Sequence, residues 1–199
     1  MERLSIERYI KGLGATYCQF ISSGLLKPEE RIRKYCLDNR CGLYGLHPMC
    51  PPRTGTITEI AKKFELFNTG ILVQYSKRLD VKNDRAGLTA TKRILHDIIL
   101  ETETFLGDKA GITTIFGMIG GDCELCEKCA GFEGEACLHP DRARPSLEAL
   151  GVDVIGLLNA LSLDGCFHDD KITWTAMVLI AESRESNRCE VTVPVVRCR

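Results

Sequence analysis

Residues 112–137 read ITTIFGMIGGDCELCEKCAGFEGEAC, and this stretch joins a strand pattern to a run of cysteines. Residues 112–119 are mostly β-branched or aromatic, which is typical of a buried strand. Gly120 and Gly121 follow directly. Behind them come four cysteines with the spacing C-x2-C-x2-C-x7-C, namely Cys123, Cys126, Cys129 and Cys137. The sequence therefore predicts that the end of a strand carries a loop with four thiols.

The segments around this stretch alternate between helix and strand patterns. Apolar residues recur at helical spacing in 57–67 and 89–105, while 69–76 and 172–181 have the composition of strands. This order predicts an α/β (or α+β) fold with a small three- to four-stranded sheet backed by helices. The pattern leaves open whether the strands pair in parallel or mixed fashion.

Weaker patterns occur in three further segments. Residues 4–26 suggest a short helix followed by a strand or an irregular segment, and residues 29–35 suggest one or two helical turns. A further helical stretch begins at Pro145-Ser146, and Gly151 is expected to break it into two pieces.

The composition is that of a soluble globular protein: 199 residues, 44% hydrophobic, 27% charged, with a formal net charge of −1. We expect a single domain, 1–199, with a first cysteine loop at 35–53, a second at 120–145 and a C-terminal tail at 182–199. The charge gives no reason to expect nucleic acid or membrane as a partner. The chain starts without a signal-peptide pattern, so we expect a cytoplasmic protein.

Seven of the eleven cysteines fall into two groups, and in a reducing compartment clustered cysteines indicate metal binding rather than disulfides. A tetrahedral zinc ion holds its sulfurs within roughly 4 Å of one another, whereas each thiolate of a 4Fe–4S cubane binds a different iron. The second group resembles the bacterial ferredoxin run, although its last interval is x7 and its proline is Pro140. We therefore favour a 4Fe–4S cluster there, with zinc as the alternative.

The first group, Cys36, Cys41 and Cys50, supplies three thiols and continues into Pro51-Pro52. Three thiolates could hold a second cubane whose fourth iron is open to water or substrate, or is bound by His47 or Cys18. They could instead bind zinc with His47 as the fourth ligand, or share one composite site with the second group. They could also belong to a purely structural loop.

The remaining candidates receive structural roles. We expect His139 to orient the second loop, His96 and His168 to be surface histidines, and Ser146 to cap a helix. Five acidic residues near the second group would either lower a cluster's reduction potential or face solvent, and we expect most of them to face solvent: Asp122, Glu124, Glu127, Glu133 and Glu135. Four cysteines match no motif and receive no ligand role, except that Cys18 stays open as a fourth ligand of the first group: Cys18, Cys166, Cys189 and Cys198.

An ordered series of motifs points to a family. It comprises Cys36…Cys41-Gly-Leu-Tyr-Gly…Cys50-Pro-Pro, then Gly-Asp-Cys123-x2-Cys126-x2-Cys129, then Cys137-x-His-Pro and Arg144-Pro-Ser-x-Glu-Ala-x-Gly-Val-Asp153. From about Cys36 to Ala181 the chain resembles a bacterial and archaeal family of predicted metal-binding proteins of unknown function. The resemblance implies a cytosolic, cysteine-ligated iron–sulfur protein and no established reaction.

Three functions are compatible with these patterns. The first is an iron–sulfur redox protein that passes electrons to a partner protein or to a small-molecule substrate at an open iron. The second is a zinc-stabilised binding module without redox activity. The third is a metal-dependent enzyme in which the three-cysteine site acts as a Lewis acid. The sequence assigns no catalytic residues and no oligomeric state.

Overall fold

The computed structural model describes residues 3–183. Its helices and strands, in chain order, are α1 (Arg3–Gly12), β1 (Tyr17–Ser22), α2 (Glu30–Leu37), α3 (Ile57–Phe64), β2 (Thr69–Arg78), α4 (Arg85–Gly107), β3 (Ile112–Met118), α5 (Val154–Ala160) and β4 (Lys171–Glu182). Short 3₁₀ helices lie at Ser23–Leu25, Ala130–Glu133 and Glu148–Leu150.

The four strands form one antiparallel sheet in the order β1-β2-β4-β3. β2 and β4 pair along their whole length, from Thr69 opposite Ile180 to Arg78 opposite Lys171. β3 pairs with the other edge of β4 and contains an irregularity between Ile112 and Thr114. The fold is therefore α+β. From the sequence we considered parallel or mixed pairing, and the sheet is neither, because every pair of strands is antiparallel.

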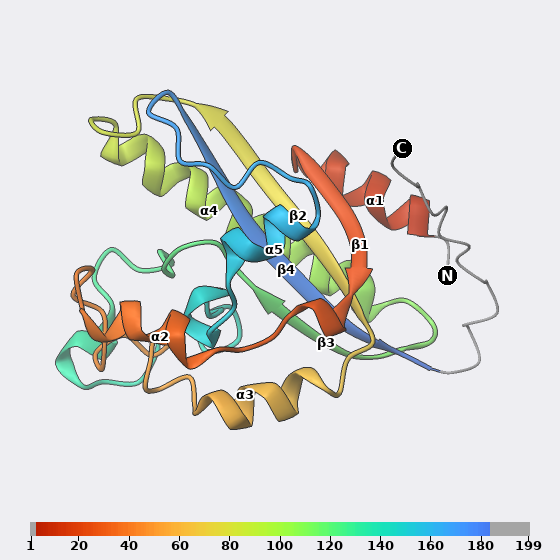
Figure 1. Cartoon of the computed structure of the whole chain (residues 1–199), viewed down its shortest axis with the longest axis horizontal. Helices are drawn as coiled ribbons and strands as arrows, with labels where there is room; N and C mark the ends of the chain where they lie inside the picture. The colour runs from red at the N-terminus through yellow and green to blue at the C-terminus, as the bar shows by residue number, and fades with distance from the viewer. Residues whose placement is uncertain (1–2, 184–199) are drawn as a thin grey trace, which may run out of the picture.

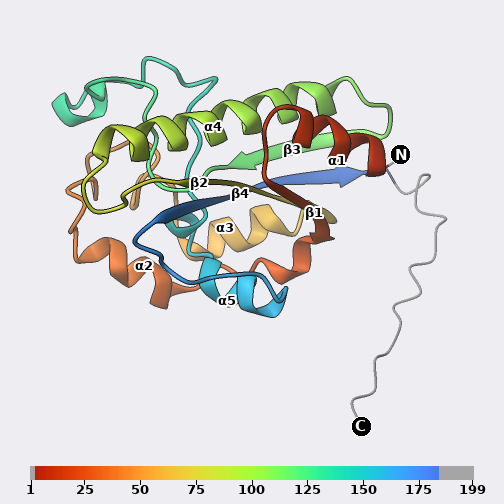
Figure 2. The ribbon, with the colours of Figure 1, turned by 90° about the horizontal axis from the view of Figure 1, so that it is seen from above.

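Helices cover both faces of this sheet (Figures 1 and 2). α1 and α4 pack on one face, while α2, α3 and α5 lie on the other. Alternate strand residues explain this arrangement, because neighbouring side chains of a strand point to opposite faces. Ile71 and Val178 are buried with α1 and α4, whereas Leu72 and Met177 are buried with α3 and α5.

The long helix α4 is the main support for the chain segment after β3. Leu95, Ile98 and Ile99 are buried against the sheet, as their helical spacing predicts. The helix begins at Arg85, four residues before the expected start, because the Asp84 carboxylate accepts a hydrogen bond from the Gly87 N–H and caps it. α4 therefore extends beside the second cysteine loop.

Several predicted boundaries change in detail. Cys36 lies in the last turn of α2 rather than in a loop. Gly151 has φ of +82° and separates Glu148–Leu150 from α5, as expected. Of the tail predicted at 182–199, Glu182 still belongs to β4, and residues 184–199, with Cys189 and Cys198, lie outside the described residues. Among residues 3–183, no helix is long and apolar enough to span a bilayer.

Candidate metal centre

All four thiols of the second group line one small cavity. It has a volume of about 20 Å³ and is enclosed by Cys123, Cys126, Cys129, Cys137, Leu125, His47 and His139. The cavity lies beyond the end of β3, where the chain passes through Gly120 and Gly121. A Cβ on Gly120 would lie 2.8 Å from the carbonyl oxygen of Thr175, so only glycine fits beside β4 there. The predicted strand-to-thiol connection is therefore present.

The three thiols of the first group line a separate, larger cavity of about 270 Å³. Cys36 comes from α2, while Cys41 and Cys50 come from the following loop, whose Pro51–Pro52 bond is cis. Residues from later in the chain also line this cavity: Asp122, Cys123, Arg144 and Glu148. The first cavity thus contains three thiols of its own and one thiol of the second group.

Cys123 lines both cavities, so the two groups converge in space. The loops that carry them lie side by side at one end of the sheet (Figures 1 and 2). Two contacts join the loops: the rings of His47 and Phe132 meet edge to face at 6.2 Å, and Gly131 packs on Pro48. The sequence left open whether the two cysteine groups lie close together. In the structure their cavities adjoin at Cys123.

Replacing Gly131 with alanine is expected to lower the free energy of unfolding by about 1–3 kcal/mol, the usual cost of overpacking. The new Cβ would lie 2.6 Å from Pro48 Cδ and 2.9 Å from the Leu46 carbonyl oxygen, so the loops must separate. Urea unfolding would measure the change. Gly107→Ala is the control, because its Cβ would meet nothing within 4 Å, and an equal loss in both variants would contradict the docking role of Gly131.

The surroundings of three of these thiols, Cys36, Cys50 and Cys123, favour their protonated form. Burial raises the pKa of Cys50 to about 12, and the neighbouring Cys41, Cys36, Asp122 and Cys123 act in the same direction. Burial is also the main cause that raises the pKa values of Cys36 and Cys123. A metal ion or cluster offsets this cost, because it binds the thiolate and displaces the proton.

The chemistry of the donor set fits a thiophilic metal or cluster. Seven thiols face two adjoining cavities, and soft thiolates select iron–sulfur clusters, zinc or copper(I) over hard cations. Every cysteine among residues 3–183 is a free thiol. Within that same part of the chain, no three His, Cys, Asp or Glu side chains are gathered as a ready site for a single metal ion.

The two candidates for a fourth ligand of the first group lie elsewhere. Cys18 is on β1 in the core under α1 and α4, and burial raises its pKa to about 12. His47 is 4% exposed and lines the cavity of the second group instead. Neither residue lines the three-cysteine cavity, so neither prediction holds in this structure.

The hydrogen bond of His47 decides what its ring can do. Its Nδ1 accepts a hydrogen bond from the Met49 N–H at 3.1 Å, and burial lowers its pKa, which favours the neutral ring. A neutral ring that accepts at Nδ1 carries its proton on Nε2. In this tautomer neither ring nitrogen of His47 has a free lone pair, which argues against a role as metal ligand. His139 lines the same cavity and, through its carbonyl, accepts hydrogen bonds from Arg142 and Ala143, in keeping with an orienting role.

The acidic residues beside Cys123 do not form a freely solvated loop. The Lys92 ammonium, 12% exposed, pairs with Asp122 at 2.5 Å and with Glu124. Lys92 belongs to α4 and lies 5.9 Å from the ring centroid of Trp174 on β4. Asp122 and Glu124 are therefore exceptions to the expected solvated loop, because a helix thirty residues earlier supplies their counter-charge.

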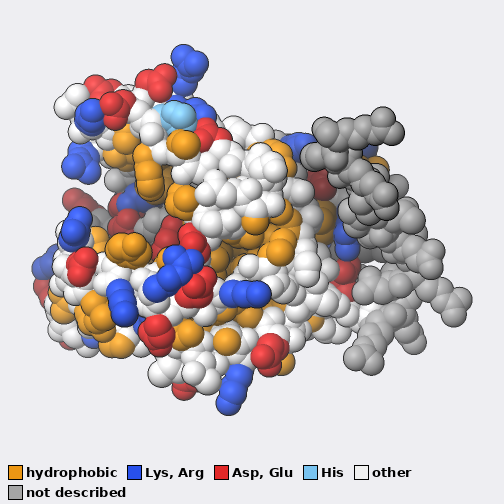
Figure 3. Space-filling model, viewed as in Figure 1, with side chains coloured by type: hydrophobic (Ala, Val, Ile, Leu, Met, Phe, Trp, Pro, Cys, Tyr) orange, Lys and Arg blue, Asp and Glu red, His pale blue; other side chains and the backbone are white. Residues whose placement is uncertain are grey.

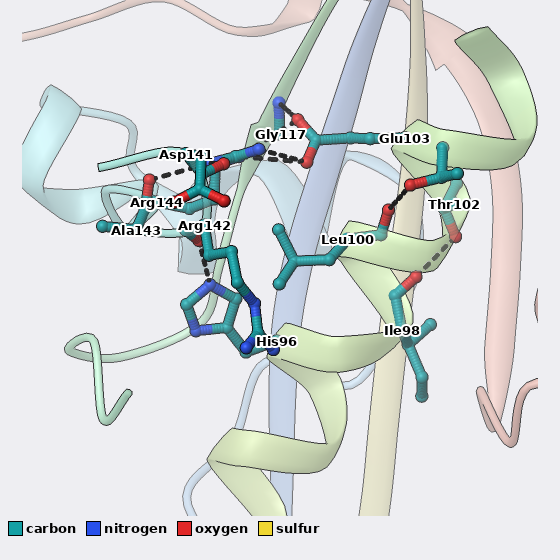
Figure 4. Close-up of polar contacts among 11 residues, drawn as sticks. His96, Ile98, Leu100, Thr102, Glu103, Gly117, Asp141, Arg142, Ala143 and Arg144 are labelled. Atoms are coloured by element: carbon teal, nitrogen blue, oxygen red, sulfur yellow. Dashed lines mark hydrogen bonds and ion pairs between the residues drawn. The ribbon is translucent and has the colours of Figure 1, made fainter. Parts of the chain in front are cut away.

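Side chains of α4 also hold the segment that follows Cys137, around Arg142 and Arg144 (Figure 4). On α4, Glu103 accepts hydrogen bonds from the Arg144 guanidinium at 2.9 Å and from the Gly117 N–H at 2.8 Å. Two turns earlier on the same helix, His96 Nε2 donates to the Arg142 carbonyl oxygen at 2.9 Å. His96 is 3% exposed, so the expectation of a surface histidine was wrong, whereas His168 is exposed as expected.

One known family accounts for most of the chain. A family model described as a predicted metal-binding protein (DUF2284) matches residues 19–180. The chain belongs to this family. The match spans both cysteine groups, α4 and the whole sheet apart from strand ends, and it begins earlier than the expected Cys36. No match is found among curated proteins or among solved structures.

Membership in this family establishes predicted metal binding and leaves the metal unnamed. The residues that the sequence analysis missed are Lys92, Glu103 and Trp174. All three lie in regular elements, away from the cysteines in sequence, and their patterns are those of an ordinary amphipathic helix and strand. Lys92, four residues before the buried His96, offered no signal of its own.

Proposed function

We propose that this protein is an iron–sulfur redox protein of the cytoplasm. In this proposal the second group, Cys123, Cys126, Cys129 and Cys137, holds a 4Fe–4S cluster. The first group, Cys36, Cys41 and Cys50, holds a second cluster with one iron free of cysteine. The observation that carries the proposal is that Cys123 lines both thiol cavities, because adjoining clusters exchange electrons within one chain.

The distribution of donors supports iron–sulfur over a single ion. The four thiols of the second group come from four points along 123–137 and surround a cavity, as the corners of a cubane require. Bound clusters would supply one-electron transfer. The chain itself partly buries six of the seven thiols, keeps Lys92 beside two carboxylates, and lines the second group's cavity with His47, and such surroundings tune a reduction potential.

The first group supports contact with a substrate. Its cavity is larger than that of the second group, and no fourth cysteine of its own lines it within residues 3–183. Three protein ligands with a free position are the usual arrangement of a reactive metal site, whereas a complete ligand set is typical of a structural or electron-carrying one. We therefore assign electron entry to the second group and small-molecule contact to the first.

A protein partner for electrons would approach beside the second group. Three large apolar side chains near that cavity are exposed: Leu46, Phe132 and Leu138, at 45%, 40% and 67%. Apolar residues gathered beside a redox centre fit a transient contact.

Anaerobic purification followed by iron, sulfide and zinc analysis tests the proposal. We expect a brown protein with absorbance near 400 nm and about four to eight irons per chain, with matching sulfide. Reduction should give an EPR signal of an iron–sulfur cluster. A colourless protein with stoichiometric zinc and no sulfide, unfolded by a chelator alone, would instead establish the zinc-stabilised binding module.

A further inference from the structure

A third cavity, much the largest of the three, lies beside the three-cysteine cavity. Its volume is about 910 Å³, within the range of small-molecule sites. It is bounded by α2, the start of α5, the first residues of β4 and the loop 164–169 before β4. Figure 3 shows a hollow on this face, with hydrophobic side chains along its walls and charged ones at its edges.

This cavity adjoins the three-cysteine cavity through two residues. Gly121 and Glu148 line both. Gly121 has φ of +76°, and a Cβ there would lie 3.2 Å from the Trp174 ring, so the backbone between the cavities is held close to β4. A molecule in the large cavity would therefore have one end near the first cysteine group.

Most charges that line the large cavity are already paired. Arg31 pairs with Asp153 at 2.7 Å, and Asp164 accepts from His168 at 2.8 Å and lies 3.4 Å from Lys171. Asp169 pairs with a lysine outside the cavity at 2.7 Å.

Arg40 is the cationic residue of this lining that has no paired carboxylate among residues 3–183. Its side chain forms no ion pair or hydrogen bond within residues 3–183, and it lines the large cavity but not the three-cysteine cavity. Glu148 also lacks a cationic partner in this part of the chain, but its exposed side chain lines both cavities, whereas Arg40 lines only the large one. The cavity therefore offers one unpaired positive charge, which suits an anionic group.

The rest of the lining suits an apolar body. Trp174 forms part of the wall, while Phe167 and Tyr35 remain 93% and 73% exposed beside the same cavity. Large exposed aromatic side chains that gather at a hollow are typical of ligand sites. Ile155, at 40% exposed, adds an aliphatic surface from α5.

We propose that this cavity binds a small organic carboxylate, with its anionic group at Arg40 and its apolar body along Trp174 toward Gly121. The proposal deepens the proposed function, because it names the substrate class of the three-cysteine site and rests on that site being reactive. The binding itself depends only on the cavity.

Isothermal titration of the purified, metal-loaded protein with 3-phenylpropanoate tests the proposal, with 3-phenylpropanamide as the uncharged analogue. We expect the carboxylate to bind and the amide to bind at least fivefold more weakly. Arg40→Gln should weaken carboxylate binding about tenfold or more, the effect of losing a charged hydrogen bond. Trp174 is the only tryptophan of the chain, so its fluorescence should change on binding.

Arg85→Gln is the matched control, because Arg85 is exposed, lies at the start of α4 and does not line the cavity. Its affinity should equal that of the wild type. Equal affinities for the acid and the amide, or an unchanged affinity in Arg40→Gln, would overturn the proposal. Metal analysis of the same samples distinguishes this proposal from the proposed iron–sulfur function. Carboxylate binding by a protein that contains zinc would support the ligand cavity and contradict the clusters. An iron–sulfur protein that binds neither compound would support the clusters and contradict the ligand cavity.

Discussion

Glu103→Ala is expected to lower the free energy of unfolding by about 3 kcal/mol, near the low end for breaking a buried ion pair by removing one partner. The side chains of Glu103 and Arg144 are only 14% and 19% exposed. The substitution leaves the Arg144 guanidinium without its carboxylate and the Gly117 N–H without its acceptor. One side chain compensates the desolvation of both groups, so its removal leaves both without compensation.

Chemical denaturation of the metal-loaded protein would measure this loss. Glu101→Ala is the matched control, since Glu101 lies two residues earlier on α4 and is exposed, and it should change stability by less than about 0.5 kcal/mol. Glu103→Ala should also release metal faster from the second group, because Arg144 holds the segment that follows Cys137. Equal stability of the two variants would show that α4 does not anchor this segment.

The sheet was predictable because its strands are locally distinct. Residues 112–119 and 172–181 are rich in β-branched side chains, and they correspond to β3 and β4 within one or two residues. Helix α4 was predictable for the same reason, since one face of the segment is apolar at helical spacing. Each of these elements has a continuous buried face, so its own sequence pattern is enough to predict whether it is a helix or a strand.

Strand order and pairing were not predictable from these patterns. β4 lies between β2 and β3 although it comes last in sequence, and that order depends on which apolar faces meet in the folded chain. Antiparallel pairing of β2 with β4 joins residues about a hundred positions apart. Local composition carries no information on contacts of this kind.

The candidate site was likewise predictable in its local features and unpredictable in its long-range contacts. Cysteine spacing brought out both thiol groups, since several cysteine ligands of one cluster often follow one another at short intervals. It did not show that Cys123 would line both cavities or that His47 would turn toward the second group. Nor did it show that Lys92 would neutralise Asp122, because each of these contacts joins separate segments.

Under the proposed function, Cys41→Ser and Cys129→Ser should each remove one of the two proposed clusters and leave the other. Cys41 lines only the three-cysteine cavity, and Cys129 lines only the four-cysteine cavity. Serine is a poor ligand for iron of this kind, so each variant should lose about four irons per chain and retain the cluster of the other group. Iron and sulfide analysis, with EPR of the reduced protein, would measure the remaining cluster.

Cys166→Ser is the control, since this exposed thiol lines neither cysteine cavity, and it should keep all of its iron. Loss of all metal from both Cys41→Ser and Cys129→Ser would mean one composite centre. Such a centre is geometrically feasible, because Cys123 lines both cavities. Cys123→Ser further distinguishes two separate clusters from one composite centre. With two clusters it removes the second and leaves the first bound by its own three thiols, whereas in a composite centre it removes everything.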